Sequence, residues 1–265
     1  MLVVARIRGI LAWRRRERAF RSEGVRRLYR ALRRLPASAA ELSGLPEPAA
    51  LQARFDGVGR SRFLGVPADG FAQSGRMQLV ALMRVGLTRT SRVLDFGCGC
   101  LRGGYWLIHY LEPGCYFGIE PHAERLAIGL ETLLEPGLAE RKRPCFDHSP
   151  DFDLAVFGER FDFVLADSIW THAAKPQIRR MLDSLIAASH ARTTLLATYL
   201  PAGTPLGPDY QGDEWVGTSH ESDVPGVIRH DLGWILEECR RRGLSARELP
   251  EPAPDSQRWI EVTRA

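Results

Sequence analysis

Residues 92–104 read Arg-Val-Leu-Asp-Phe-Gly-Cys-Gly-Cys-Leu-Arg-Gly-Gly, a short apolar strand that runs into a glycine-rich turn and then into a helix. Gly97 and Gly99 let the backbone pass close to a ligand, because neither carries a Cβ. The helix beyond the turn offers free backbone N–H groups that suit a carboxylate. Asp95 stands just before the turn, where it can meet a cationic group. The stretch therefore predicts a ligand site built on a strand, a turn and a helix.

A second acid follows the next expected strand. Glu120 ends the run Tyr116 to Glu120 and lies 21 residues after Gly99. An acid at this position reaches the first turn and can accept hydrogen bonds from both hydroxyls of a ribose. Asp95 and Glu120 together predict a ligand that carries a ribose and a cationic group. The plain alternative for each acid is a capped or solvated carboxylate at a strand end.

A dinucleotide fold uses the same second acid, so the two ligand classes must be separated. The dinucleotide fingerprint is Gly-x-Gly-x-x-Gly/Ala, and here Arg102 occupies its third glycine position. Asp95 would also repel a pyrophosphate. An acid at the turn suits a ligand with an ammonium group and no phosphate, and S-adenosylmethionine has that chemistry.

The segment Asp95–Gly99 resembles motif I of class I S-adenosylmethionine-dependent methyltransferases. Glu120-Pro121 resembles the acidic motif II of that family, and residues 161–172 resemble motif IV with the segment after it. The resemblance covers about residues 73–263, with the motifs in the right order. It implies that the cofactor is S-adenosylmethionine and that the activity is methyl transfer.

The resemblance also implies a set of cofactor-binding residues. Asp95 and the backbone of Gly97, Cys98 and Gly99 would hold the methionine end, and Glu120, followed by Pro121, the ribose. The remaining implied positions are Asp151 and Phe152, which would flank the adenine, and Asp167 after the fourth strand. For Asp151 and Phe152, an ordinary structural role is an equal alternative.

Alternating strand and helix patterns predict the fold. Expected strands are 93–96, 115–120, 143–147, 161–166, 193–200, 245–249 and 258–263, and expected helices are 73–85, 104–111, 123–134, 176–188 and 231–242. This order favours a parallel sheet covered by helices on both faces, with the last two strands as an antiparallel hairpin. With the resemblance, the prediction is an α/β, Rossmann-like, seven-stranded methyltransferase sheet over residues 51–265, with 51–70 irregular. A helical extension and linker, residues 1–50, precedes it.

The acceptor is predicted from the residues that follow the fourth and fifth strands. His172, just beyond the fourth strand, is the candidate base for an oxygen acceptor, with a packing or capping histidine as the alternative. His220 and His230 read as loop histidines in a long segment, 201–230, expected to cover the site. Its aromatic residues favour a small-molecule hydroxyl acceptor, such as a sugar or glycolipid. The Asn/Asp-Pro-Pro-Tyr/Phe motif of adenine and glutamine N-methylation is absent.

Residues 1–34 form a basic arm. They contain twelve Arg and two Glu, a balance of +10, while the rest of the chain has 24 basic and 30 acidic residues, a balance of −6. Two short amphipathic helices are expected there, and their arginines favour an anionic membrane surface. In the alternative function, the protein binds a membrane surface or nucleic acid through this arm, and the methyltransferase-like fold serves as a scaffold. Nucleic acid is disfavoured because the arm has few aromatic residues for base stacking. A helical extension packed on the body or on a partner chain is a further alternative.

The rest of the sequence predicts a cytoplasmic protein with no metal-ligating residues of its own, held at the inner face of the membrane by its arm; whether a divalent metal assists stays open. The Arg-rich, acid-poor start also resembles an organellar transit peptide, which is the alternative. The five cysteines show no paired metal-ligand spacing, so free thiols in a reducing compartment are expected. No apolar run is long enough to span a bilayer, and Arg6 and Arg8 interrupt the N-terminal apolar residues. The sequence leaves the oligomeric state open.

Overall fold

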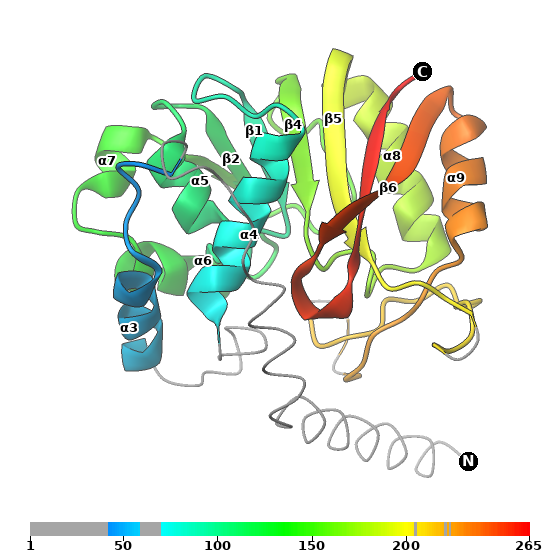
Figure 1. Cartoon of the computed structure of the whole chain (residues 1–265), viewed down its shortest axis with the longest axis horizontal. Coiled ribbons are helices and arrows are strands. Elements are labelled where there is room, and N and C mark those ends of the chain that lie inside the picture. The colour runs from blue at the N-terminus through cyan, green and yellow to red at the C-terminus, as the bar shows by residue number, and fades with distance from the viewer. Residues whose placement is uncertain (1–41, 59–69, 204–205, 220–221, 223) are drawn as a thin grey trace.

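A computed structural model describes residues 42–58, 70–203, 206–219, 222 and 224–265. Within these ranges seven strands form one sheet in the order β3-β2-β1-β4-β5-β7-β6 (Figure 1). The strands are β1 (Val93–Phe96), β2 (Tyr116–Ile119), β3 (Cys145–Asp147), β4 (Phe161–Ala166), β5 (Ser189–Tyr199), β6 (Leu244–Pro252) and β7 (Arg258–Arg264). Strands β1 to β5 pair in parallel, and β7 is antiparallel to β5 and β6. The predicted sheet, with its antiparallel C-terminal hairpin, is confirmed.

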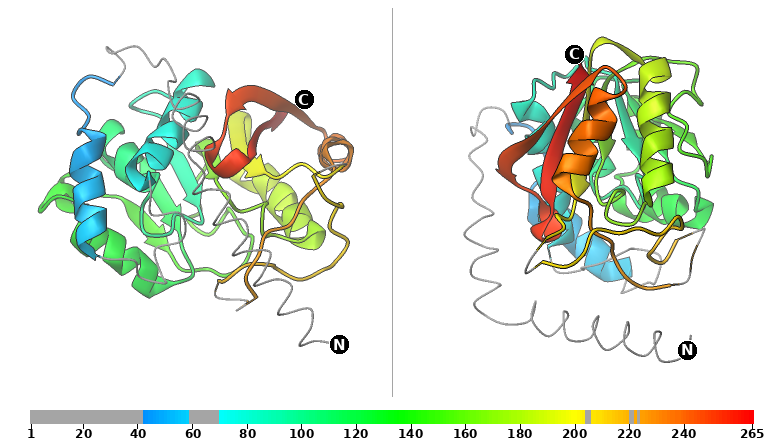
Figure 2. Two further views of the ribbon diagram at one scale, coloured as in Figure 1. Left: turned by 60° about the horizontal axis from the view of Figure 1, so that its bottom comes forward. Right: turned by 90° about the vertical axis from the view of Figure 1, so that its right-hand side faces the viewer.

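Helices cover both faces of this sheet. One face packs against α3 (Pro48–Val58), α4 (Phe71–Arg84), α5 (Gly104–Tyr110), α6 (Ala123–Ile128), the π-helix η1 (Gly129–Leu133) and α7 (Leu138–Lys142). The other face packs against α8 (Lys175–Ala188) and α9 (Leu232–Arg240). Figures 1 and 2 show these two groups of helices apart from each other. Side chains alternate between the faces, so Val93 of β1 enters the first core and Leu94 the second.

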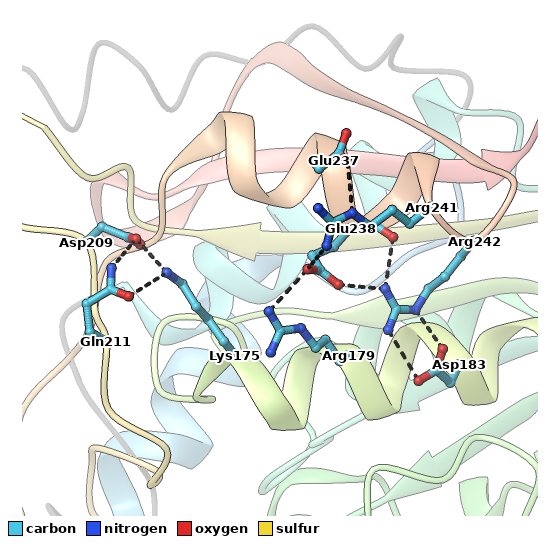
Figure 3. Close-up of polar contacts among 9 residues, drawn as sticks. All are labelled: Lys175, Arg179, Asp183, Asp209, Gln211, Glu237, Glu238, Arg241 and Arg242. Carbon is cyan, nitrogen blue, oxygen red and sulfur yellow. Dashed lines mark hydrogen bonds and ion pairs between the residues drawn. The ribbon is translucent and has the colours of Figure 1, made fainter.

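Two separate groups of ion pairs join α8 to α9 and to the segment after β5 (Figure 3). Glu238 of α9, with a side chain only 5% exposed, accepts from Arg179 of α8 at 3.2 Å and from Arg242 at 2.7 Å. Lys175 at the start of α8 pairs with Asp209 at 2.6 Å. The Lys175–Asp209 pair holds the beginning of the 201–230 segment against α8.

The prediction that residues 51–70 are irregular is wrong for residues 51–58, which belong to α3. Leu51 and Phe55 lie one helical turn apart and are buried, and Phe55 stacks on Phe71 with ring centroids 4.1 Å apart. Tertiary packing on α4 therefore stabilises a helix whose own apolar pattern is weak. Helix α3 crosses residue 50, where the boundary between the extension and the methyltransferase domain is predicted, and this boundary stays a prediction. The arm lies outside the described residues, so its two helices also stay predictions.

Two other expectations differ in detail. The helix expected over 123–134 is α6 up to Ile128 and continues as η1 from Gly129. The strand expected from residue 143 begins at Cys145, because Arg143 takes a left-handed conformation with φ 50° at the end of α7. Among the described residues, no helix is long and apolar enough to cross a bilayer.

Candidate functional site

The glycine-rich turn follows β1 at the carboxyl edge of the sheet, where α/β proteins bind ligands. Gly97 and Gly99 have φ of 75° and 57°, in the left-handed region that favours glycine. The backbone N–H groups of Gly97 and Cys98 donate to the carbonyl of Ile119 at 2.9 and 3.0 Å. The turn is thereby tied to the end of β2. A Cβ on Gly97 would lie 2.3 Å from the side chain of Ile169, which packs directly on the turn.

Glu120 is held at the turn by two backbone N–H groups. Its Oε2 accepts from Gly99 at 3.0 Å and its Oε1 from His122 at 2.9 Å, while Arg125 lies 3.9 Å away. Its side chain is only 5% exposed, and Pro121 beside it is half-buried. The carboxylate is thus fixed in one orientation and keeps lone pairs that can accept from a pair of hydroxyls.

Asp95 is buried beneath the turn. Its carboxylate accepts from the Tyr116 hydroxyl at 2.8 Å. Burial raises the pKa of Asp95 to about 7, with Asp167 and Glu120 adding to the rise and Tyr116 and Arg102 opposing it. Burial also raises the pKa of the Cys98 thiol. At neutral pH Asp95 therefore lies between its neutral and ionised forms, and a nearby cation would favour the ionised form.

Asp167 lies in a polar cluster drawn from four separate elements. Its Oδ2 accepts from Gln78 of α4 at 2.6 Å and from Arg102 of the turn at 2.7 Å. Asp255, between β6 and β7, lies 4.0 Å from Arg102. Burial raises the pKa of Asp167, and Arg102 opposes the rise. No sequence pattern points to Gln78 or Asp255, and Arg102 stands out in the sequence only as the residue that breaks the dinucleotide fingerprint.

The two candidate adenine residues lie in different surroundings. Phe152 is buried, with its ring 5.3 Å from that of Phe96 and 6.2 Å from that of Trp215. Asp151 has a side chain 71% exposed, which pairs with Arg180 of α8 at 3.6 Å. The structure therefore brings Phe152 to the carboxyl edge and directs the Asp151 charge towards α8.

His172 contacts the segment that follows β5. Its Nδ1 donates to the Val216 carbonyl at 2.7 Å, and its ring stacks on Trp215 at 5.5 Å. Burial lowers the pKa of His172, although the carbonyls of Val216 and Gly226 oppose the shift. His172 thus holds the segment that was expected to cover the site.

The other histidines of this segment have different positions. His230 is fully buried, and its Nε2 donates to the Ala173 carbonyl at 3.0 Å. His220 lies outside the described residues. In the described ranges, no group of three or more His, Cys, Asp or Glu is arranged to hold a metal ion.

Comparisons with known proteins bear on the fold. Neither the protein-family models nor the curated proteins that were searched match this sequence. One similar solved structure is the magnesium protoporphyrin IX methyltransferase ChlM from Synechocystis PCC 6803 with bound SAH. Its TM-score is 0.55 and its sequence identity 17%, and the match covers 80% of this chain and 94% of the ChlM chain.

Two further structures show the same likeness. The glycopeptide N-methyltransferase MtfA has a TM-score of 0.54 and 13% identity over 72% of this chain and 90% of that one. DhpI, solved as an SAH complex, has a TM-score of 0.51 and 12% identity, and the match covers 82% of this chain and 95% of the DhpI chain. At these identities the likeness concerns the fold, and the chain has the class I methyltransferase fold.

Proposed function

We propose that this chain is an S-adenosylmethionine-dependent methyltransferase that acts on a small molecule. The observation that carries the proposal is the Glu120 carboxylate, held at the glycine-rich turn by the N–H groups of Gly99 and His122. The fold places this carboxylate beside the buried acid Asp95. The structures of ChlM and DhpI, which share the fold, contain SAH, the demethylated product S-adenosylhomocysteine.

The charges of the site fit this cofactor. Among the described residues, the site holds four acids and two arginines: Asp95, Glu120, Asp167 and Asp255, with Arg102 beside Asp167 and Asp255 and Arg125 beside Glu120. Such a balance suits a ligand with net positive charge and no phosphate, as S-adenosylmethionine has through its sulfonium and ammonium groups. Glu120 would accept from the ribose hydroxyls, and Phe152 would lie against the adenine. Asp95 and Asp167 would pair with the ammonium, and Arg102 with the carboxylate of the amino-acid end.

When bound, S-adenosylmethionine supplies a methyl group on a sulfonium sulfur. A lone pair of the acceptor oxygen forms the new C–O bond, the C–S electron pair stays on sulfur, and the hydroxyl proton is released. The chain would align the two reactants and exclude water. His172 is the proposed acceptor of the proton, and its contacts with Val216 and Trp215 support a second role in holding the covering segment.

A small-molecule hydroxyl, on a sugar or glycolipid, is the acceptor we propose. Trp215 and Tyr210 lie in the segment after β5, and aromatic rings of this kind stack on the apolar faces of sugars. ChlM and MtfA are named for different acceptors, a porphyrin and a glycopeptide, so the shared fold accommodates varied small molecules.

Calorimetry with SAH and with NAD tests the cofactor. We expect SAH to bind and NAD not to bind, because Arg102 replaces the third glycine and Asp95 repels phosphate. Binding of NAD without binding of SAH would refute the proposal. Transfer of a labelled methyl group from S-adenosylmethionine to sugars, phenols and amines then tests the acceptor class, and label on amines alone would refute a hydroxyl acceptor.

A second candidate role concerns the arm, residues 1–34. Its balance of +10 against −6 for the rest of the chain supports binding to an anionic membrane surface. A cytoplasmic enzyme held at the inner leaflet would meet a lipid-linked acceptor there. The same charge is the basis of the alternative in which the methyltransferase fold serves as a scaffold for surface binding.

A further inference from the structure

Two helices each place a glycine against the backbone of the glycine-rich turn. A Cβ added to Gly75 of α4 would lie 1.9 Å from the carbonyl oxygen of Arg102 and 2.7 Å from its carbonyl carbon. A Cβ added to Gly129, where α6 passes into η1, would lie 2.6 Å from the carbonyl oxygen of Cys100. These distances fall below the 3.0 Å under which real Cβ atoms are essentially never found. Because the obstructing atoms are backbone, no side-chain rotation relieves the contact.

Leu101 stands between these two contacts in a strained conformation. Its φ of 66° lies in the left-handed region, which is unfavourable for leucine, and its side chain is fully buried. Such a conformation persists only where the surrounding structure holds it. The helices contact Cys100 before it and Arg102 after it. Close approach at Gly75 and Gly129 therefore holds the backbone on both sides of Leu101.

Gln78 extends the contact between α4 and the turn. It lies on the same face of α4 as Gly75, and a Cβ added to Gly103 would lie 1.8 Å from its Oε1. Its Nε2 donates to Asp167 at 2.6 Å. Helix α4 thus contacts both the backbone of Arg102 and the side chain of Asp167. Glu120 is held by Gly99, at the start of the turn, and by His122, which lies outside the turn.

We propose that Gly75 and Gly129 are positioning residues of the cofactor site. They allow α4 and η1 to close on the turn and hold Leu101, and with it Arg102, in the geometry that binds the amino-acid end of the ligand. The inference rests on the proposed function, because the ligand is the proposed cofactor. Both glycines act through the backbone of the turn. The ribose end, anchored at Glu120, depends less on them.

The test compares two probes on the full chain. SAH carries the amino-acid end, and methylthioadenosine has the same adenosine and sulfur without it. In Gly75→Ala and Gly129→Ala we expect the SAH affinity measured by calorimetry to fall by about tenfold to a hundredfold. The methylthioadenosine affinity should change little. Gly75→Ala should show the larger fall, because its contact is the closer one.

Gly57→Ala is the matched control. Gly57 is a helical glycine of α3 with nothing within 4 Å of an added Cβ, so both probes should bind this variant as they bind the wild type. An equal loss of both probes in Gly75→Ala and Gly129→Ala, or an unchanged SAH affinity, would overturn the inference. If Gly75→Ala does not fold, the ratio of the two affinities in Gly129→Ala decides. Failure of the wild type to bind SAH would refute the proposed function and this inference with it.

Discussion

The backbone N–H of Gly99 donates to Oε2 of Glu120 across 3.0 Å and so joins the turn after β1 to the end of β2. Phe96 and Ile119 are paired in parallel register, which brings the residues that follow the two strands side by side. The bond holds the acid where a ribose would meet it. The relationship makes Glu120 the first residue to test.

Glu120→Ala should weaken SAH binding by about 1–3 kcal/mol, the cost of removing charged hydrogen bonds. Loss of the carboxylate removes the acceptor of the ribose hydroxyls and leaves the Gly99 N–H without its partner. Calorimetry measures the change. Glu124→Ala, an exposed acid on the first turn of α6, is the control and should bind SAH normally. Unchanged affinity in Glu120→Ala would remove Glu120 from the site.

Binding of SAH should strengthen as the pH rises towards 7. Burial raises the pKa of Asp95 to about 7, so the free site holds a neutral carboxyl below that pH and a carboxylate above it. The ligand ammonium pairs with the carboxylate, so binding releases a proton at low pH. Affinity should therefore fall by up to about tenfold per pH unit below 7 and level off above it. Calorimetry across pH measures this, and Asp95→Asn should flatten the profile; a flat wild-type profile would contradict the assignment.

Local patterns predicted the strands well and the contacts between distant segments poorly. Strands β1 and β4 match their predicted bounds, because each is a short buried apolar run that ends at a turn. Helix α3 was missed because its stability comes from packing on α4. The contact of Gln78 with Asp167 joins residues 89 positions apart, and no periodicity reports such a pairing. The left-handed Leu101 was equally hidden, because leucine does not favour that conformation.

Arg102→Met should destabilise the chain by about 3–5 kcal/mol, because it leaves the buried carboxylate of Asp167 without its charge partner. Urea unfolding measures the loss. The double variant Arg102→Met/Asp167→Asn should recover most of the stability, since position 167 no longer carries a buried charge and Asp255, which also loses Arg102, is partly exposed. Its affinity for SAH should stay low, because the ligand has lost Arg102 as partner of its carboxylate and Asp167 as partner of its ammonium. Normal SAH affinity in the double variant would show that Arg102 serves folding alone.

His172→Ala should lower the melting temperature and increase proteolytic cleavage within residues 201–230. The variant loses the hydrogen bond to Val216 and the stacking on Trp215, which hold this segment. Limited proteolysis with and without SAH measures the effect, and Thr218→Ala, at an exposed position of the same segment, is the comparison. If stability and cleavage stay as in the wild type while methyl transfer falls, His172 acts as a base and not as a support.

Residues 1–34 should bring the chain to anionic membranes without contributing to cofactor binding. Their twelve arginines and two glutamates give a balance of +10, and each Arg near an anionic surface contributes about 1 kcal/mol, less as salt screens it. Full-length protein should therefore sediment with phosphatidylglycerol vesicles at low salt and not with neutral phosphatidylcholine vesicles. The shortened chain for comparison should begin at Leu42, because α3 starts at Pro48 and buries Leu51 and Phe55 in the core. This chain should stay in the supernatant and bind SAH as the full chain does. Equal sedimentation of both chains would make the arm a structural extension and leave a glycolipid acceptor without support.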